Sequence, residues 1–197
     1  MLFCLCSGML KYSDFNLCLM VKVELSEGRR LQAAPTSNVV MATCGHGDEA
    51  NIITLGMYMP ISSRPPLVCI GVAPQRYSHH LIEETGEFVV NSPSIVLEKE
   101  MHYCGVESGR RVNKWRETGL TRIPGLKLET PRIKECFGHL ECKVVESYVL
   151  GDHTLFVGEV VCASADEEVL SGESLDALKA KPIVQKNHVY FTVTDKK

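Results

Sequence analysis

The sequence predicts a mainly β protein, built as a small antiparallel barrel of about six strands with short helices between them. Short β-type runs bounded by turn residues follow one another along the chain. Two long β-type segments flank Gly151-Asp152, a strong signal for a hairpin. The regular alternation of strands and helices that a Rossmann-type sheet requires is missing. The pattern therefore favours a β-barrel over a parallel α/β sheet.

Apolar runs rich in β-branched residues predict the individual strands. We expect strands over residues 39–44, 52–58, 67–73, 87–91, 140–149, 154–165 and 189–193. The segment 62–66 is expected to turn, because its paired prolines remove two backbone donors and forbid a helix. These strands succeed one another closely enough for antiparallel pairing.

In two segments, the spacing of the apolar residues is that of a helix and not of a strand. Over residues 78–85, apolar residues fall on one face, Ser78 can serve as the N-cap, and Gly86 offers a left-handed stop. Residues 94–103 also look helical, because Leu97, Met101 and Cys104 are spaced for one face. We therefore predict two short helices among the strands.

Composition limits the possible function classes. The chain has 197 residues, of which 45% are hydrophobic and 23% charged, and its net charge is −3. These values describe one ordered globular domain and argue against a nucleic-acid binder, which needs a clustered positive surface. The nine cysteines include no C-x-x-C pair, and most lie in apolar runs. We expect free, buried thiols and a cytoplasmic location, where thiols stay reduced.

The first 19 residues are set apart from the rest of the chain. The stretch 1–20 is apolar, but no basic residue precedes its apolar part, and Lys11 and Asp14 interrupt it. It is too short and broken for a membrane span and poor as a signal peptide, and no other segment approaches the length of a span. We predict that residues 1–19 are a poorly ordered extension or a misassigned start, followed by one domain over residues 20–197.

Familiar catalytic and nucleotide motifs are missing from the sequence, which lacks G-x-G-x-x-G, a Walker loop, G-x-S-x-G and H-E-x-x-H. His79 and His80 are adjacent, and adjacent helical residues point about 100° apart, so we predict no metal site there. One basic aromatic patch is formed by Arg110, Arg111, Lys114, Arg116 and Trp115. It is either a solvated loop or a lip that attracts an anionic nucleotide.

Four stretches of the chain form a specific combination. The first is Asn51-Ile-Ile-Thr-Leu-Gly-Met-Tyr-Met-Pro-Ile-Ser62 followed by Pro65-Pro66-Leu67, and the second is Arg76-Tyr-Ser-His-His-Leu-Ile-Glu-Glu-Thr-Gly-Glu-Phe-Val-Val-Asn91. The third is Gly151-Asp-His-Thr-Leu-Phe-Val-Gly-Glu-Val160, and a weaker fourth is Ser108-Gly109-Arg110 with Lys114-Trp115. In this order they resemble the flavin reductase-like family, the FMN-binding split barrels that include flavoredoxin. The resemblance implies a six-stranded antiparallel Greek-key split barrel, bound FMN, and a homodimer with the flavin near the subunit boundary.

The FMN phosphate is a near-dianion and needs fixed donors. Arg76 offers a forked guanidinium, while Ser78 and His79 offer side-chain and backbone donors where a helix begins. The helix dipole favours an anion at the same place. The alternative is that Arg76 is a surface residue and Ser78 merely caps the helix. The resemblance makes phosphate binding the better interpretation.

The flavin ring is flat and largely apolar, and its edge carries carbonyls and nitrogens. A shallow slot with a few backbone and hydroxyl partners suits it. The resemblance places the strand around Thr54 along one edge of the ring, with Thr43 and Cys44 nearby and Ile61 and Ser62 closing the slot. Ordinary barrel packing is the alternative for each of these residues. The predicted FMN contacts are Thr43, Cys44, Asn51, Ile53, Thr54, Leu55, Gly56, Met57, Ile61, Ser62, Arg76, Tyr77, Ser78 and His79.

His153 is the candidate catalytic residue. It follows Asp152 just before a strand, and in similar proteins this histidine lies at the flavin face. There it would orient the pyridine nucleotide or hydrogen-bond the reduced ring. The alternative is a hairpin histidine that contacts only solvent or Asp152. Glu159 is excluded as its direct partner, because six residues of a straight strand span about 20 Å.

The leading hypothesis is a cytoplasmic FMN-dependent oxidoreductase. NADH or NADPH would deliver hydride to the flavin, which would pass electrons to a small-molecule or protein acceptor. A second hypothesis is a flavoredoxin-like electron carrier between proteins that makes no direct use of nicotinamide. A third is a binding module without enzymatic activity. None of the three predicts a nucleic-acid or membrane partner.

Overall fold

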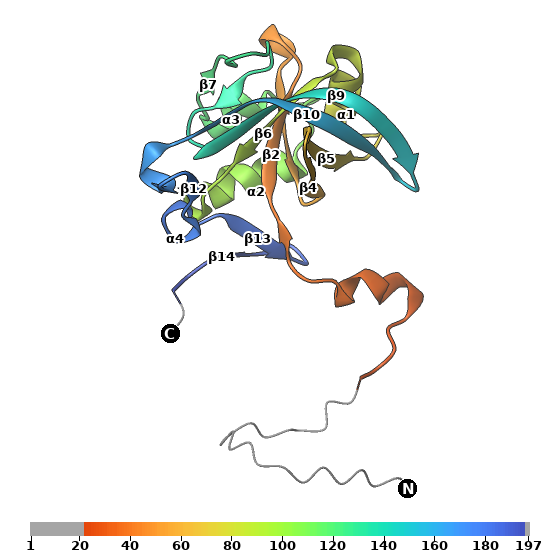
Figure 1. The fold of residues 1–197 in the computed structure, drawn as a ribbon. Helices are drawn as coiled ribbons and strands as arrows, with labels where there is room; N and C mark the ends of the chain where they lie inside the picture. Colours follow the sequence, from red (N-terminus) through yellow and green to blue (C-terminus); the bar gives the residue numbers. More distant parts are fainter. Residues whose placement is uncertain (1–21, 196–197) are drawn as a thin grey trace, which may run out of the picture. The chain divides into compact units, whose positions relative to one another are not determined.

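The computed structural model describes residues 22–195 and divides them into two units, 22–34 and 35–195 (Figure 1). In the first unit, Glu27–Ala33 forms a short 3-10 helix, η1, with no buried residue. The extension predicted over residues 1–19 lies outside the described residues. Within residues 22–195, no helix combines the length and apolar character that a membrane crossing needs.

Seven antiparallel strands form the main sheet, in the order β3-β2-β6-β9-β10-β5-β4. They are β2 (Val40–Cys44), β3 (Asn51–Leu55), β4 (Tyr58–Ser63), β5 (Pro66–Val72), β6 (Glu87–Ser92), β9 (Gly138–Leu150) and β10 (His153–Ala165). The sheet has one strand more than expected, because the run predicted over 52–58 is divided into β3 and the start of β4. Every other predicted strand of this sheet is confirmed within one or two residues.

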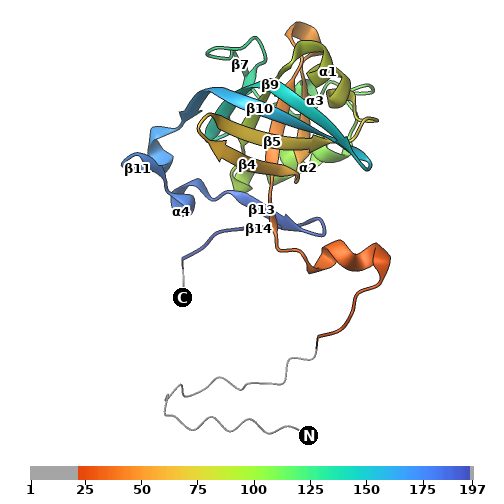
Figure 2. The ribbon, with the colours of Figure 1, turned by 45° about the vertical axis from the view of Figure 1, so that its right-hand side comes forward.

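The main sheet curls into a barrel that stays open along one side. Its edge strands β3 and β4 do not pair with each other in the described part of the chain, although β3 contacts β5. Figure 2 shows β4 and β5 in front of the rest of the sheet, with the long hairpin of β9 and β10 beside them. The hairpin turn contains Gly151 with φ 63°, as Gly151-Asp152 predicted. The architecture is the expected mainly β split barrel with short helices.

Smaller elements surround this sheet. The predicted strand 189–193 forms β14 in a separate sheet of order β1-β13-β14. The short strands are β1 (Ser37–Asn38), β7 (Arg122–Ile123), β8 (Arg132–Ile133), β11 (Leu170–Ser171), β12 (Ser174–Leu175), β13 (Ile183–Lys186) and β14 (Val189–Thr192). The short helices are η2 (Gly47–Glu49), η3 (Ile95–Leu97), η4 (Glu167–Val169), α3 (Lys114–Thr118) and α4 (Ala177–Ala180).

The two predicted helices are α1 (Tyr77–Thr85) and α2 (Glu98–Val106). Gly86 ends α1 with φ 66°, which confirms the predicted left-handed stop. The predicted N-cap at Ser78 is wrong. Arg76 holds that position in an extended conformation, and Ser78 lies buried in the first turn. The reason is tertiary, because the Ser78 hydroxyl accepts a hydrogen bond from Asn51 instead of capping the helix.

Two apolar clusters pack on opposite faces of the central strands. Alternate residues of β2 divide between them: Val40 and Ala42 belong to the cluster inside the barrel, and Met41 to the cluster beneath α2. Leu97, Met101 and Cys104 lie together in the second cluster, which confirms the predicted buried face. The strands at the candidate site are therefore held rigidly from both sides.

All six cysteines of the described chain are free thiols, as predicted. Cys162 is partly exposed, and the other five, Cys44, Cys69, Cys104, Cys136 and Cys142, are buried. Burial raises the pKa of Cys44 to about 12 and the pKa of Cys104 to about 11. These thiols remain protonated at neutral pH and act as small apolar side chains.

Candidate functional site

The candidate site begins where β3 and α1 meet. The Asn51 side-chain amide donates a hydrogen bond of 2.8 Å to Ser78 Oγ, and both residues are buried. Asn51 and Ile53 lie on the same side of β3, because alternate residues of a strand share a face. This bond fixes the first turn of α1 against the start of β3.

A cavity of about 320 Å³ opens beside this contact, and we call it the helix-start pocket. It is lined by Asn51, Ile53, Gln75, Arg76, Tyr77, Ser78, Cys104, Gly105, Glu107, Ser108, Gly109, Arg110, Arg111 and Lys114. It brings together five of the predicted FMN contacts, namely Asn51, Ile53, Arg76, Tyr77 and Ser78. Its remaining residues come mainly from α2 and from the segment that follows it.

The start of α1 carries free backbone donors at this pocket. The first N–H groups of a helix have no acceptor within the helix. The N–H of His79 donates to the Arg76 carbonyl at 3.1 Å, whereas the hydrogen bonds of the described residues include none from the N–H of Tyr77 or Ser78. Together with the helix dipole, these two donors make the start of α1 suitable for an anion.

The segment from Glu107 to Asn113, here called the 107–113 loop, packs over the start of α1. Arg110 Nη1 donates to the Gln75 carbonyl at 2.8 Å, and its guanidinium carbon lies 5.6 Å from the centre of the Tyr77 ring. Gly109 has no room for a side chain, because a Cβ there would collide with Asn51 Oδ1 and lie 2.8 Å from Tyr77 Cδ1. The absence of a side chain at Gly109 lets the loop close onto the pocket.

Lys114 lies buried at the back of the helix-start pocket. Its Nζ donates to the carbonyls of Ile52 and Cys104, each at 2.7 Å, and so ties β3 to α2. Burial lowers the pKa of Lys114 below its ordinary value, while the nearby thiols of Cys104 and Cys44 act in the opposite direction. Next to it, Trp115 Nε1 donates to the Ala50 carbonyl at 2.9 Å.

The basic patch identified in the sequence therefore divides into two parts. Arg110 and Arg111 are exposed and line the helix-start pocket, while Lys114 and Trp115 are buried and hold β3 in place. Arg116 is exposed and lines neither this pocket nor the adjoining one. Arg110 and Arg111 thus lie at the pocket, and their role as a lip that attracts an anionic nucleotide stays a prediction.

Several predicted contacts lie near the pocket but make other bonds. Thr54 Oγ1 donates to the Met101 carbonyl at 2.5 Å, and Thr43 Oγ1 donates to the Pro131 carbonyl at 2.5 Å. Cys44 and Leu55 belong to the apolar cluster inside the barrel. At Gly56, a Cβ would lie 2.9 Å from Gln185 Nε2. None of these five residues lines the helix-start pocket.

His79 is also placed apart from the pocket. It is buried, with Nε2 at 2.8 Å from Thr154 Oγ1 and Nδ1 at 3.2 Å from a Glu83 carboxylate oxygen. Its ring packs edge-on against Phe156. Internal partners thus engage the ring and the backbone N–H of His79, which anchors α1 to β10. Within residues 22–195, no group of three His, Cys, Asp or Glu side chains is arranged to hold a metal ion.

Met57, Ile61 and Ser62 lie at or beside the edge strand β4, away from the helix-start pocket. Met57 and Ile61 are exposed, at 50% and 42% of their surface. These three predicted contacts therefore share the edge of the sheet and not the cavity at α1.

His153 lies at the start of β10, where the hairpin turns. Its Nδ1 is 2.7 Å from Asp152 Oδ1, and its side chain is partly exposed. The same hydrogen bond is the main reason why the pKa of Asp152 lies below its ordinary value. His153 does not line the helix-start pocket, and its role at the flavin stays a prediction.

Sequence reasoning missed several residues of the pocket. Gln75, Gly105 and Glu107 carried no signal, because their placement depends on how α2 packs against β3 and α1. Gly109 was named only within a weak motif, and its lack of a side chain proves essential for the packing of the loop. A tight turn preceding a basic pair was the signal that could have identified it.

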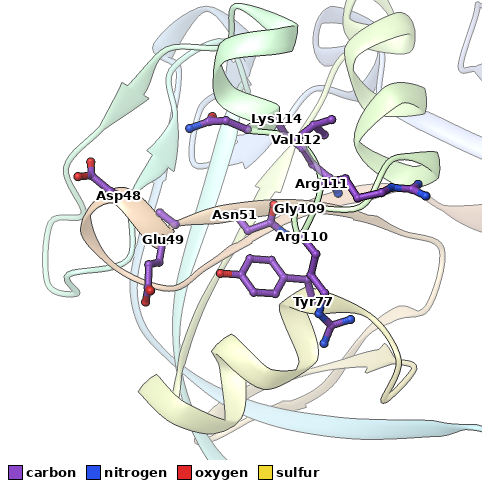
Figure 3. Close-up of a pocket in the computed structure, with 11 residues that line it drawn as sticks. Asp48, Glu49, Asn51, Tyr77, Gly109, Arg110, Arg111, Val112 and Lys114 are labelled. Carbon is purple, nitrogen blue, oxygen red and sulfur yellow. The ribbon is translucent and has the colours of Figure 1, made fainter.

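A second cavity, of about 290 Å³, adjoins the first, and we call it the outer pocket (Figure 3). Asn51, Tyr77, Gly109, Arg110, Arg111 and Lys114 line both cavities. Asp48, Glu49, Ala50, Val112 and Asn113 line the outer pocket alone. The 107–113 loop is thus a common wall of the two cavities.

The whole of this site lies within a recognisable family domain. The sequence profile described as "Flavin reductase like domain" matches residues 32–193. The chain belongs to the flavin reductase-like family.

Individual relatives agree with this assignment. A protein of Pyrococcus abyssi is 36% identical over 146 residues, which cover 74% of this chain and 83% of that protein. The crystal structure of flavoredoxin from Methanosarcina acetivorans superposes with a TM-score of 0.80 at 30% identity, covering 90% of this chain and 94% of the other. The NADH-dependent FMN reductase AsuE2 of Streptomyces nodosus is 24% identical over 170 residues, covering 86% of this chain and 85% of that reductase.

Proposed function

We propose that this member of the flavin reductase-like family binds FMN and catalyses its reduction by NADH or NADPH, with onward transfer of electrons to an acceptor. The observation that supports it most directly is the convergence of Arg76, the free N–H groups of Tyr77 and Ser78, and the loop arginines on one cavity. Such a group of donors suits the phosphate of a mononucleotide.

The residues present fit FMN in charge and size. Arg76, Arg110, Arg111 and Lys114 line the helix-start pocket, against the single carboxylate of Glu107. A volume of about 320 Å³ falls at the lower end of the range usual for small-molecule sites. Beside the charged groups, Ile53 supplies an apolar side chain, and Gly105 lines the pocket with backbone alone.

When bound, FMN supplies a ring that accepts a hydride and passes electrons on one or two at a time. Arg76 and Ser78 would hold the phosphate, and the Asn51 amide would keep Ser78 in position. Lys114 would fix the strand that borders the ring. His153 would orient the incoming nicotinamide. With Nδ1 occupied by Asp152, its Nε2 remains available for this contact.

The electron carrier is a second candidate. It is favoured by the similarity to flavoredoxin at 30% identity. The similarity to AsuE2, an NADH-dependent FMN reductase, favours direct use of NADH instead. Both candidates bind FMN, and one experiment separates them. The purified protein is loaded with FMN, and its absorbance is followed without oxygen as NADH or NADPH is added. Rapid bleaching supports the reductase, and an unchanged spectrum supports the carrier. Protein that does not take up FMN would contradict both.

We also propose that the chain forms a homodimer through the outer face of β4, β5 and β10. Met59 is paired with Cys69, and Cys69 with Val157, so their side chains form an apolar stripe across three strands. Met59 is exposed on this face, and Ile61, the unpaired residue at the bulge of β4, is exposed beside it. Contact with a second copy would cover them and bring Met57, Ile61 and Ser62 to a subunit boundary. Light scattering tests this, because a monomer mass would contradict it.

We propose a reducing compartment such as the cytoplasm, which the free thiols of the described chain support.

A further inference from the structure

His79 is a buried, titratable side chain that the proposed FMN site leaves unused. It lies in the first turn of α1 but lines neither cavity, and 6% of its surface is exposed. Its Nε2 is 2.8 Å from Thr154 Oγ1, its Nδ1 is 3.2 Å from a carboxylate oxygen of Glu83, and its ring packs against Phe156. The side chain therefore links the helix that begins at the helix-start pocket to β10.

This link reaches β10 where the long hairpin leaves the body of the barrel. Thr154, opposite Val72, is the residue nearest the hairpin turn that pairs with β5. His153 lies one residue nearer the turn, where the described strands give β10 only β9 as a neighbour. The last residues of β9 before the turn, 148–150, are exposed, so packing contributes little to holding this end of the hairpin. Thr154 is thus the point at which the hairpin end, with His153, is fastened to the barrel.

The contact between His79 and Thr154 is directional and shielded from water. The carboxylate beside Nδ1 favours a proton on that nitrogen, which leaves Nε2 of the neutral ring to accept from the Thr154 hydroxyl. Thr154 is buried, with 3% of its surface exposed. Neighbouring residues of a strand point to opposite faces, so His153 points away from His79. His79 can therefore influence His153 only through the backbone of β10.

We propose that His79 is a positioning residue, which holds His153 at a fixed distance from the start of α1 through the hydroxyl of Thr154. This inference rests on the proposed function, in which the start of α1 binds the phosphate of FMN and His153 orients the nicotinamide. One side chain of α1 then sets the distance between the group that holds the cofactor and the group that guides the hydride donor. Such distances matter, because a misplacement of about 1 Å can cost about 100-fold in rate.

The first test needs no flavin and compares His79→Leu with His79→Gln. The two side chains are similar in size and neither has a ring, but only glutamine can bond to the Thr154 hydroxyl. The ring signals of His153 in nitrogen-15 NMR, assigned by their loss in His153→Ala, should shift in His79→Leu and return toward their original positions in His79→Gln. His80→Leu, a change of an exposed histidine of the same helix, should leave them in place. No shift in His79→Leu, or the same shift in both variants, would overturn the proposal.

The second test follows the reduction of bound FMN by NADH in stopped flow. His79→Leu and Thr154→Val should each slow this step about tenfold, because His153 is displaced but still present. His79→Gln should recover most of the loss. In a His153→Ala background neither substitution should slow the step further, because the group that they position is gone. An equal slowing with and without His153 would show that His79 acts independently of it, and would overturn the proposal. Thr154→Val keeps the branched shape of the side chain, so it provides the comparison if His79→Leu does not fold.

Failure of the proposed function is seen in the unaltered chain. Calorimetry reports whether it binds FMN, and absorbance reports whether NADH reduces the bound flavin. A negative result in either measurement contradicts the proposed function. The NMR comparison uses flavin-free protein, so it still decides whether His79 fixes the position of His153.

Discussion

The amide of Asn51 donates to the hydroxyl of Ser78 across 2.8 Å, and this one bond joins the start of β3 to the first turn of α1. Both residues are buried, so removal of either side chain leaves the other without this partner where water has little access. The bond holds the first turn of α1 against the strand, together with the contact of His79 with Thr154 of β10. The helix-start pocket is built around it.

A double-mutant cycle measures this contact. Asn51→Ala leaves the buried Ser78 hydroxyl without its donor and should lower the free energy of unfolding by about 1–3 kcal/mol. Ser78→Ala should cost a similar amount. The double variant should lose less than the sum, by about 1 kcal/mol, because the two residues share one bond. Urea unfolding measures all three, and strictly additive losses would show that the bond contributes nothing.

Arg76 is expected to determine affinity for FMN. Arg76→Ala removes a charged, forked donor and should weaken FMN binding about 10- to 100-fold. Arg76→Lys should recover only part of this, because an ammonium lacks the planar fork. Arg116→Ala serves as the control, because Arg116 is exposed and lines neither cavity. Titration of flavin fluorescence gives the dissociation constants, and unaltered binding by Arg76→Ala would remove Arg76 from the site.

Gly109→Ala should disturb the loop without changing any charge. The added methyl group would meet Asn51 and Tyr77, so the 107–113 loop must shift, at a cost of about 1–3 kcal/mol in unfolding free energy. FMN binding should weaken as well, because Arg110 and Arg111 move with the loop. Gly28→Ala is the control, because a Cβ there meets nothing within 4 Å. Equal stability and equal FMN affinity in the two variants would show that the loop tolerates a side chain at 109.

His153→Ala tests the orientation of nicotinamide. The reduction of bound flavin by NADH should slow by about 10- to 100-fold, because the ring of the nucleotide is no longer held in position. The dissociation constant for FMN should stay the same, since His153 does not line the helix-start pocket. Asp152→Asn should lower the rate of flavin reduction by a smaller factor, because Nδ1 of His153 loses a charged hydrogen-bond acceptor but the ring stays in place. Stopped-flow absorbance measures the rate, and reduction at the normal rate in His153→Ala would exclude this role.

The buried thiols predict how stability depends on pH. The pKa of Cys44 is raised from 9.0 to about 12, so the folded chain holds this proton after the unfolded chain has lost it. The contribution of Cys44 is therefore fully present below pH 9 and is lost as the pH rises toward 12. Urea unfolding should show a smaller loss of stability between pH 8 and pH 10.5 in Cys44→Ala than in the unaltered chain. Cys162→Ala, a substitution of the one partly exposed thiol described, is the control.

Local sequence signals predicted the parts of the fold that depend on single turns. Gly86 ends α1 and Gly151 turns the long hairpin, because each requires a positive φ that glycine adopts freely. The spacing of Leu97, Met101 and Cys104 gave the buried face of α2 for the same local reason. These features could be inferred without knowing what lies across the fold.

The parts that could not be predicted depend on partners far along the chain. Lys114 is buried because the carbonyls of Ile52 and Cys104 receive its ammonium group, and only the packing of β3 against α2 brings them there. His79 lies away from the pocket because Thr154 of β10 takes up its ring. The motif around residues 76–79 indicated that a helix begins there, but the N-cap was predicted two residues too late, and the side chains that face inward were not predicted.

The 107–113 loop lines both cavities, so a change that displaces the loop alters the two cavities together. Gly109 is the most sensitive point of this shared wall, because even one added methyl group would meet the side chains of Asn51 and Tyr77. The shape of each cavity therefore depends on a position that carries no side chain at all.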